Sequence, residues 1–304
     1  KRKVMAKKVY IRIPASIGNM GSGFDCAGLS LKLYNEFTVE RAKATEIEFS
    51  EPPDEASPEQ VLSLFLKAFN ITMKISGEKS FPVKIIMDNN IPFKRGFGSS
   101  ATVILAGVIS ALLLTDRSIR KEDILKISLP VEGHIDNLAA SLYGGFAIGS
   151  ADTVKVVSIQ PPEKLIVIAF IPAEGLSTKL AREVLHSEVS VSDAVYNLSS
   201  TGFLCAAFFL KRLELLKFGL GDKLHQPYRA ALIPHLKTLL VYRKPASVIG
   251  GCLSGAGPSV VFFAESKNSK RALLEVKNIV REEKLKGVVI LFYPGGKTSW
   301  KVVK

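Results

Sequence analysis

The chain has 304 residues, 47% hydrophobic and 23% charged, and its 41 Lys and Arg against 28 Asp and Glu give a net charge of +13. This composition excludes a mainly disordered chain, which needs low hydrophobicity, and the length suffices for one large domain or two ordinary ones. The positive charge favours anionic partners, namely a nucleotide, a phosphorylated metabolite, nucleic acid or an acidic membrane, without choosing among them.

The cysteines and the apolar segments indicate a cellular compartment. Three cysteines, Cys26, Cys205 and Cys252, are scattered and never spaced C-x-x-C, so a disulfide framework and a cysteine-zinc site are not expected. The longest apolar stretch, Val103 to Leu114, is shorter than the roughly 20 residues that cross a bilayer. We therefore expect a cytoplasmic protein without a membrane partner. The basic segment Lys1 to Val4, ahead of Met5, is expected to lie outside the fold.

The first third of the chain predicts strands, a glycine-rich loop and one amphipathic helix. Lys8 to Ile13 alternates as a half-buried strand does, and the small-residue stretch Ala15 to Gly23 that follows Pro14 predicts a loop. A helix should begin at Ser57, because Ser57 and Gln60 form a capping box and Pro58 occupies the first turn. Further strands are predicted at Glu36 to Glu40, Glu46 to Phe49 and Val83 to Met87.

The middle of the chain continues the mixed pattern. Ala101 to Leu114 is apolar almost all round, which predicts a buried helix, and Lys121 to Leu129 predicts another. Glu132-Gly133-His134 should then interrupt helical structure. Strands are predicted at Gly144 to Ile148, Val154 to Ile159 and Leu165 to Phe170.

The last third predicts more helices than strands. The expected helices are Lys179–Leu185, Ser190–Leu210, Arg212–Phe218 and Lys267–Glu283, and the expected strands are Val248–Leu253, Val260–Ala264 and, as the last element, Val288–Phe292. Pro161-Pro162 is the best boundary between two halves, 5–160 and 161–304. Short groups of strands separated by helices predict an α+β fold in two lobes.

The segment from Pro92 to Thr102 carries the strongest local signal for a ligand. Gly96-Phe97-Gly98-Ser99-Ser100 opens directly into the predicted buried helix. Glycines let the backbone approach a ligand closely, and the unpaired amides of a helix N-terminus attract phosphate. A side chain at Gly98 would on this interpretation meet the phosphates. The alternative is an ordinary helix start after a turn. The segment matches neither a P-loop nor a dinucleotide fingerprint.

Two other small-residue segments and one polar cluster have both a structural and a functional interpretation. Ser254 to Ser259 lies between two apolar strands and is, taken alone, a hairpin connection. The stretch Asn19 to Gly23 has the same ambiguity. Glu132-Gly133-His134-Ile135-Asp136-Asn137 is either a solvated loop or a site for Mg²⁺ or a proton, since Mg²⁺ binds one or two carboxylates plus phosphate oxygens. The other histidines lie apart and give no zinc spacing.

Taken together, these motifs resemble one protein family. The segment from Pro92 to Thr102 resembles the ATP loop of the GHMP kinases, and the stretches Pro14–Asp25 and Ser254–Pro258 resemble that family's first and third motifs. Within the family the chain resembles the homoserine kinases, in Glu132–Phe146, in Ser177–Arg182 and in His225-Gln226-Pro227-Tyr228-Arg229. The similarity runs from about residue 9 to residue 264, and Lys94 and Arg95 replace small residues usual before the glycines.

The resemblance implies a fold, an activity and a set of site residues. It implies a two-lobe fold whose first lobe is like the second domain of ribosomal protein S5 and whose second lobe is an α/β sandwich. The expected activity is transfer of the ATP γ-phosphate to L-homoserine in threonine biosynthesis, by a homodimer that uses Mg²⁺ and binds neither nucleic acid nor membrane. The expected nucleotide-binding residues are Pro92, Lys94, Arg95, Gly96, Phe97, Gly98, Ser99, Ser100, Ala101 and Thr102, with Ser100 and Glu132 for the metal.

The same resemblance implies the acceptor pocket. Asn19, Asp25, His134 and Asn137 are the expected catalytic group, and the expected homoserine-binding residues are Asp25, His134, Asn137, Thr178, Arg182, Arg229 and Gly255. Arg182 and Arg229 suit the substrate carboxylate because a guanidinium binds a carboxylate bidentately, and Asp25 suits the ammonium. Whether Asp136 or Asn137 serves as a base, or the hydroxyl attacks without one, stays open from the sequence.

Two rivals predict different features. A mevalonate-type kinase of the same family would share the ATP loop but not the His225–Arg229 segment. A non-catalytic nucleic-acid module would account for the charge of +13 but would leave the glycine loops and Glu132-Gly133-His134 unexplained.

Overall fold

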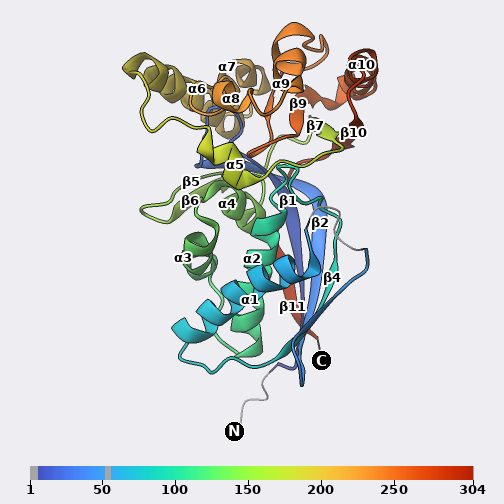
Figure 1. Ribbon diagram of the computed structural model, residues 1–304. Coiled ribbons are helices and arrows are strands. Elements are labelled where there is room, and N and C mark those ends of the chain that lie inside the picture. The colour runs from blue at the N-terminus through green and yellow to red at the C-terminus, as the bar shows by residue number, and fades with distance from the viewer. Residues whose placement is uncertain (1–5, 52–55, 304) are drawn as a thin grey trace.

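The structure is a computed structural model that describes residues 6–51 and 56–303. Lys1 to Val4, expected outside the fold, lie outside the described residues. Figure 1 shows two lobes, one above the other, each built from helices and strands, which confirms the predicted α+β class. In the described part of the chain, no helix is both long and apolar enough to cross a membrane.

The first lobe is built on a seven-stranded sheet. Five strands follow the order β11-β1-β2-β4-β3, and β5 pairs with β2 and with β6. Only the β3–β4 pair is parallel. The strands are β1 (Lys8–Gly18), β2 (Ala27–Arg41), β3 (Glu46–Phe49), β4 (Val83–Asp88), β5 (Phe146–Ser150), β6 (Lys155–Ile159) and β11 (Ser299–Val303).

Four helices lie on one side of this sheet; two pack directly against its strands and two pack mainly on those helices (Figure 1). They are α1 (Pro58–Ile75), α2 (Ser99–Leu114), α3 (Lys121–Glu132) and α4 (Asp136–Tyr143). Helix α1 begins with the predicted capping box of Ser57 and Gln60. Helix α2 is buried almost all round, as predicted, because β1, β2, α1, α3 and α4 all pack against it.

The prediction of a loop was wrong for Ala15 to Gly18, because β1 continues to Gly18, and it was right for Asn19 to Gly23. The strand passes Pro14 with a shift of register between Pro14 and Ser16, so the proline does not end it. A Cβ at Gly18 would lie 2.3 Å from Asp136 Oδ2, and one at Gly28 would lie 2.6 Å from the Asp136 carbonyl oxygen. Small residues are therefore needed here so that α4 can pack against the two strands.

The second lobe has a four-stranded antiparallel sheet in the order β10-β7-β9-β8. Its strands are β7 (Leu165–Pro172), β8 (Gly250–Leu253), β9 (Val260–Glu265) and β10 (Gly287–Phe292). Its helices are α5 (Thr178–Glu183), α6 (Val191–Phe209), α7 (Leu216–Gly219), α8 (Gln226–Arg229), α9 (His235–Lys237) and α10 (Ser269–Glu282). Short 3₁₀ helices lie at Leu213–Leu215 and Ser266–Asn268, and a π-helix at Thr238–Tyr242. The turn Ser254–Ser259 joins β8 to β9 as the hairpin connection that its sequence predicted.

Strand β7 joins the two lobes. Alternate side chains along it, from Leu165 to Ile171, pack in one core with β1, β2 and α6, and those between them pack with α9 and α10. Strand β11 was not predicted; it pairs with β1 in the first sheet. We therefore keep the division at residue 160 as a proposal, in which β11 belongs to the first lobe although it follows residue 160.

Candidate active site

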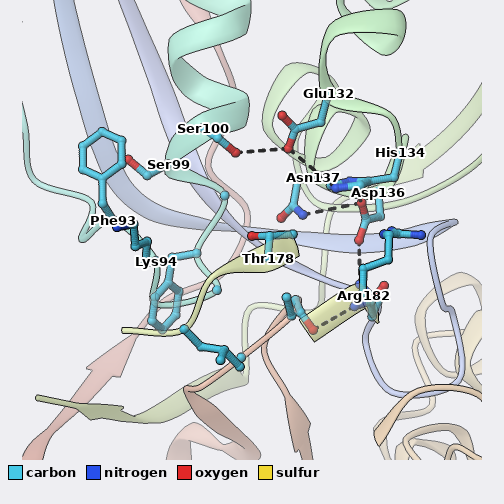
Figure 2. A pocket seen from close by; sticks show the side chains of 18 of the residues that line it. Phe93, Lys94, Ser99, Ser100, Glu132, His134, Asp136, Asn137, Thr178 and Arg182 are labelled. Atoms are coloured by element: carbon cyan, nitrogen blue, oxygen red, sulfur yellow. Dashed lines mark hydrogen bonds and ion pairs between the residues drawn. The ribbon is translucent and has the colours of Figure 1, made fainter. Parts of the chain in front are cut away.

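A cavity of about 310 Å³ lies between the two lobes. Figure 2 shows side chains converging on it from α2, from the segment 132–137 and from α5. Most of the predicted site residues line it together: Asn19, Asp25, Pro92, Lys94, Gly96, Phe97, Gly98, Ser99, Ser100, Glu132, His134, Asn137, Thr178, Arg182, Arg229 and Gly255.

Three predicted nucleotide-binding residues do not line this cavity. The Arg95 guanidinium is buried and donates to the carbonyl oxygens of Phe93, Pro172 and Ala173. Ala101 is fully buried in α2, and Thr102 Oγ1 accepts from Asn35 Nδ2 at 3.0 Å and donates to the Ser99 carbonyl oxygen at 2.7 Å. These residues support the loop before α2 and the start of α2 from the side that faces away from the cavity.

The start of α2 is equipped to bind an anion. Gly98 precedes the helix in the left-handed conformation, with φ of 69°, and no side chain caps the first amides. Ser99 Oγ, which is buried and lines the cavity, has no hydrogen-bond partner within the described residues. Such a buried hydroxyl calls for a partner, and the uncapped amides carry partial positive charge. A phosphate group would satisfy both.

Hydrogen bonds from three segments to carbonyl oxygens of the loop 94–98 hold this loop in place. Ser254 Oγ donates to the Gly96 carbonyl oxygen at 2.6 Å, Ser16 N to that of Phe97 at 3.0 Å, and Leu176 N to that of Lys94 at 3.0 Å. That a side chain at Gly98 would meet the phosphates stays a prediction, and the structure adds a second reason for glycine at this position. A Cβ there would lie 2.4 Å from Ser16 Oγ and 2.9 Å from Asn137 Oδ1, so Gly98 is required by packing and by its positive φ.

Glu132, at the end of α3, faces the start of α2. Ser100 Oγ donates to Glu132 Oε1 at 3.1 Å, and burial raises the pKa of the Glu132 carboxyl. One carboxylate and one hydroxyl beside an anion site suit Mg²⁺, which completes its shell with phosphate oxygens and water. No group of three or more His, Cys, Asp or Glu in the described ranges could hold a metal ion alone.

His134 and Asp136 form a pair on the side of Glu132 that faces away from Ser100 (Figure 2). The pair joins His134 Nδ1 and Asp136 Oδ1 at 3.0 Å, and Asp136 Oδ2 accepts from Asn19 N at 2.9 Å. Burial lowers the pKa of His134, but the hydrogen bond and charge of Asp136 outweigh burial and raise it to about 9. His134 is therefore a cation at neutral pH, and both Asp136 oxygens already accept hydrogen bonds. The predicted break at this segment is confined to 133–135, because Asp136 and Asn137 begin α4.

The predicted acceptor residues Asp25 and Arg182 bind each other. The Arg182 guanidinium donates to both Asp25 oxygens, at 2.8 and 2.9 Å. Asn19 holds this arrangement, since its Oδ1 accepts from Asp25 N at 2.9 Å and its Nδ2 donates to the Gly255 carbonyl oxygen at 2.8 Å. An amino acid with one carboxylate and one ammonium could pair with the two residues in their place.

Arg229 is buried, 2% exposed, beside this pair. Its Nε donates to the Ala181 carbonyl oxygen at 3.1 Å, and its Nη1 donates to that of Gly255 at 3.2 Å and to His225 Nδ1 at 3.0 Å. His225 Nε2 in turn donates to the Gly21 carbonyl oxygen at 2.9 Å. Burial lowers the pKa of Arg229 to about 10 and also lowers that of His225, which is neutral. The His225–Arg229 segment thus connects the first glycine loop to the hairpin at Gly255.

The sequence reasoning missed Phe24. Its ring stacks on His225 with centroids 5.1 Å apart and lies 5.6 Å from the Arg229 guanidinium and 5.7 Å from that of Arg182. It therefore orients both arginines. The available signal was a single aromatic residue in a small-residue loop, since binding residues are found disproportionately on loops.

We expect the protein to lose stability in mild acid because of His225. The groups that face it are Asp222, Arg229, Asp25 and the Gly21 carbonyl. The unfolded chain takes up a proton near pH 6.5 and the folded protein does not, so lowering the pH favours unfolding. The free energy of unfolding should fall by up to about 1.4 kcal/mol per pH unit below that value. Denaturant unfolding at several pH values measures it.

Two variants separate His225 from other titrating groups. His225→Gln should be less stable at neutral pH but should lose less stability on acidification. His186→Gln, the same substitution at an exposed imidazole, is the matched control. An unchanged slope in His225→Gln would contradict the assignment.

Comparison with known proteins agrees with this geometry. Residues 61–145 match the family model of the GHMP kinases N terminal domain, and residues 206–281 match GHMP kinases C terminal. Homoserine kinase of Caldanaerobacter subterraneus is 36% identical over 91% of this chain and 90% of its own, and that of Aquifex aeolicus is 34% identical over 86% and 89%.

Solved structures show the same fold. Homoserine kinase from Cytophaga hutchinsonii superposes with a TM-score of 0.82 at 23% identity and covers 99% of both chains. The mevalonate kinase of Methanococcus jannaschii has a TM-score of 0.65 at 16% identity and covers 96% of this chain and 99% of its own.

Proposed function

The chain belongs to the GHMP kinase family, and on that premise we propose that its interlobe cavity transfers the γ-phosphate of ATP to the hydroxyl of L-homoserine, giving O-phospho-L-homoserine for threonine biosynthesis. The observation that carries the proposal is one cavity with two unlike ends. At one end are the uncapped start of α2 and the unpartnered Ser99 hydroxyl, and at the other end are Arg182, Arg229 and Asp25. The first end suits a triphosphate and the second an amino acid.

At the nucleotide end, the start of α2 holds the phosphates, and Lys94 adds a cation beside them. Ser100 and Glu132 would hold Mg²⁺, which neutralises charge on the phosphates when bound. The support for these assignments is the Ser100–Glu132 contact and the position of both residues on the wall of the cavity. Arg95, Ala101 and Thr102 act by supporting the loop.

At the acceptor end, Arg229 and Arg182 bind the homoserine carboxylate and Asp25 binds its ammonium. Thr178 and Gly255 complete that wall, and Asn19 orients Asp25. The reacting hydroxyl then lies on the side of His134 and Asn137. The His134 cation stabilises negative charge that moves onto the transferred group.

We propose that the hydroxyl attacks without a protein base. Both Asp136 oxygens already accept hydrogen bonds. Burial raises the pKa of Asp136, but the hydrogen bond and the positive charge of His134, with backbone hydrogen bonds, outweigh burial and lower it below its usual value. His134 is already protonated at neutral pH, and Asn137 cannot take up a proton. The homoserine oxygen forms the new bond to phosphorus as the bond to the ADP oxygen breaks, and the hydroxyl proton leaves with the phosphoryl oxygens.

Phosphorylation of a panel of alcohols tests the function. ADP release and ³¹P NMR of the product should show rapid turnover of L-homoserine and little of L-serine, L-threonine or mevalonate. Preference for mevalonate would support the rival kinase of the same fold. Tight, salt-resistant binding of nucleic acid with no ADP release would support the non-catalytic rival.

The role of Asp25 predicts a specific pattern with 4-hydroxybutyrate, which lacks the amino group. The wild type should use it roughly 10- to 100-fold less efficiently than homoserine, because a hydrogen bond to a charged group contributes about 1.5–3 kcal/mol. The Asp25→Ala variant should distinguish the two alcohols much less. Comparison of kcat/KM for both substrates in both enzymes measures this, and equal discrimination would remove Asp25 from the ammonium site.

We also propose that the enzyme is cytoplasmic and works as a homodimer. The three cysteines are all free, as is usual in a reducing compartment.

A further inference from the structure

A second cavity, of about 400 Å³, lies within the second lobe. Its walls come from α7, α8, α9 and the π-helix that follows α9, and from strands β8 and β9 (the three α-helices are in the upper lobe of Figure 1). It has no lining residue in common with the interlobe cavity. A volume of this size is typical of a pocket for a small organic molecule.

Most of the wall of this second cavity is apolar. Leu220, Leu236 and Phe262 line it from three different segments, and each is at most 4% exposed. Val241 of the π-helix also lines it and is 67% exposed, which places an apolar side chain at the opening. Such a wall gains free energy by covering an aliphatic tail, whereas it offers nothing to a small, strongly hydrated ion such as phosphate.

Three lysines give the second cavity a positive charge. Lys217, Lys237 and Lys244 all line it, and all three are exposed. Within the described residues none of the three has an acidic partner, whereas Arg243, next to Lys244 in the chain, pairs with two glutamates at the end of α10. Unpaired cations beside an apolar wall favour an organic anion.

The remaining polar groups show which kind of anion suits the cavity. Asp222 is the single acidic residue that lines it, but this side chain is 0% exposed. Its oxygens accept from the backbone amides of Leu224, His225 and Gln226 at 2.9, 3.0 and 2.7 Å, so it is not available to an ammonium group. Gln226 Oε1 accepts from Leu253 N at 2.8 Å, and Gln226 Nε2 has no acceptor in the described part of the chain. These groups suit a carboxylate without an amino group.

Gly250 gives an independent indication that one wall is kept clear for a ligand. It begins β8 and lines the cavity, although glycine is unfavourable in strands. A Cβ at Gly250 would meet the end of the flexible Leu220 side chain at 2.9 Å, and the next nearest atom lies 3.8 Å away. The backbone of the protein therefore does not require glycine here, but a ligand that approaches the strand closely would require it.

We propose that the second cavity is a regulatory site for a small carboxylate with an aliphatic tail. The tail lies against Leu236 and Phe262, and the carboxylate lies at the opening, where it accepts from Gln226 Nε2 and from the lysines. Occupancy of the site strengthens the binding of homoserine at the interlobe cavity, a consequence that rests on the proposed function.

Helix α8 provides the link, because it forms a wall of both cavities. Gln226 at its start lines the second cavity, and Arg229 at its end lines the interlobe cavity. Gln226 also holds Leu253, two residues before Gly255, whose carbonyl oxygen accepts from Arg229 Nη1. A carboxylate on Gln226 Nε2 restrains this side chain and, through it, the helix and the turn that position Arg229. The entropy lost in ordering them is then no longer a cost of binding homoserine.

Calorimetric titration of the whole protein with hexanoate tests the site. The affinity should rise roughly three- to four-fold for each methylene added between butanoate and octanoate. Inorganic phosphate lacks the tail and hexylammonium lacks the negative charge, so both should bind at least roughly 10-fold more weakly than hexanoate. Saturating homoserine should not displace hexanoate, which excludes binding of the carboxylate to Arg229.

Variants of the cavity provide the matched comparison. Replacing both Lys237 and Lys244 with glutamine should weaken hexanoate binding by roughly 2- to 30-fold, because one exposed ion pair contributes little. The control replaces Lys270 and Lys277 of α10, two exposed lysines of the same lobe, with glutamine and should bind as the wild type does. Gly250→Ala should also weaken binding, since it puts a methyl group into the space for the ligand.

Initial-rate kinetics test the regulatory role. Hexanoate should lower the KM for homoserine several-fold and leave the KM for ATP unchanged. By linkage, homoserine should increase the affinity for hexanoate by the same factor by which hexanoate increases that for homoserine. The variant with both Lys237 and Lys244 replaced should need more hexanoate for the same effect.

Several results would overturn the proposal. No binding of hexanoate, its displacement by homoserine, equal binding of hexylammonium, or binding of anionic vesicles alone would each remove the site. Hexanoate that binds without changing the KM for homoserine would remove the regulatory role. The expected binding pattern in a protein that phosphorylates no homoserine would overturn the proposed function and leave the carboxylate site in place.

Discussion

Replacing Arg229 with alanine should raise the KM for homoserine by roughly 10- to 1000-fold, from a loss on the order of 1.5–4 kcal/mol. Arg229 is buried at the acceptor end, and three of its hydrogen bonds, to Ala181, Gly255 and His225, aim the guanidinium into the cavity. Alanine removes the carboxylate partner. The KM for ATP should barely move, because the start of α2 is formed by other residues. Initial-rate kinetics with each substrate varied in turn measure both constants.

Two controls separate recognition from folding in this experiment. Arg229→Lys keeps a charge but cannot reproduce the planar fork of donors, so it should recover only part of the loss. The unfolding temperature of each variant shows whether the hydrogen bonds to Ala181 and Gly255 also support the fold. An equal rise in both KM values, or full recovery with lysine, would argue against a bidentate carboxylate site.

Replacing Glu132 with glutamine should lower turnover by on the order of 100-fold or more at limiting Mg²⁺, since charge neutralisation by a metal contributes several kcal/mol. Glutamine keeps the shape of the side chain and can still accept from Ser100 Oγ, but it removes the anionic ligand. Excess Mg²⁺ should therefore restore part of the activity. Turnover measured as a function of Mg²⁺ concentration at saturating ATP checks this expectation.

Stability distinguishes a metal ligand from a structural residue at this position. Burial raises the pKa of the Glu132 carboxyl, which means that the folded protein disfavours its charge. Glu132→Gln should accordingly unfold at the same temperature as the wild type or at a higher one. A variant with the wild-type dependence on Mg²⁺ and a lower unfolding temperature would make Glu132 a structural residue.

Features that depend on near neighbours in the chain could be predicted from the sequence. The capping box of Ser57 and Gln60 begins α1 because its hydrogen bonds span only three residues. The unbroken apolar composition of 101–114 predicted the buried helix α2, and the motifs around Gly98 and Arg229 predicted the family and most residues of the cavity wall. Local periodicity and short motifs contain this information because they act within one element.

Only the tertiary structure decided features that depend on distant segments. Strand β1 continues past Pro14 because β2 and α4 pack against its small residues, and β11 exists because β1 offers it an edge. Arg95 turns away from the cavity toward carbonyl oxygens at the end of β7, a strand some 75 residues further along.

The acceptor end of the cavity shows most clearly which features the sequence predicts and which depend on the tertiary structure. The sequence indicated that Asp25, Arg182 and Arg229 belong to one pocket, but their pairing and the place of Phe24 between two guanidinium groups depend on how the lobes meet. Contacts between residues more than 150 positions apart leave no periodic trace in the chain, because neither partner alters the local pattern of the other. The residue types for phosphate and amino-acid binding were therefore set by the sequence, and their mutual geometry by the packing of the two lobes.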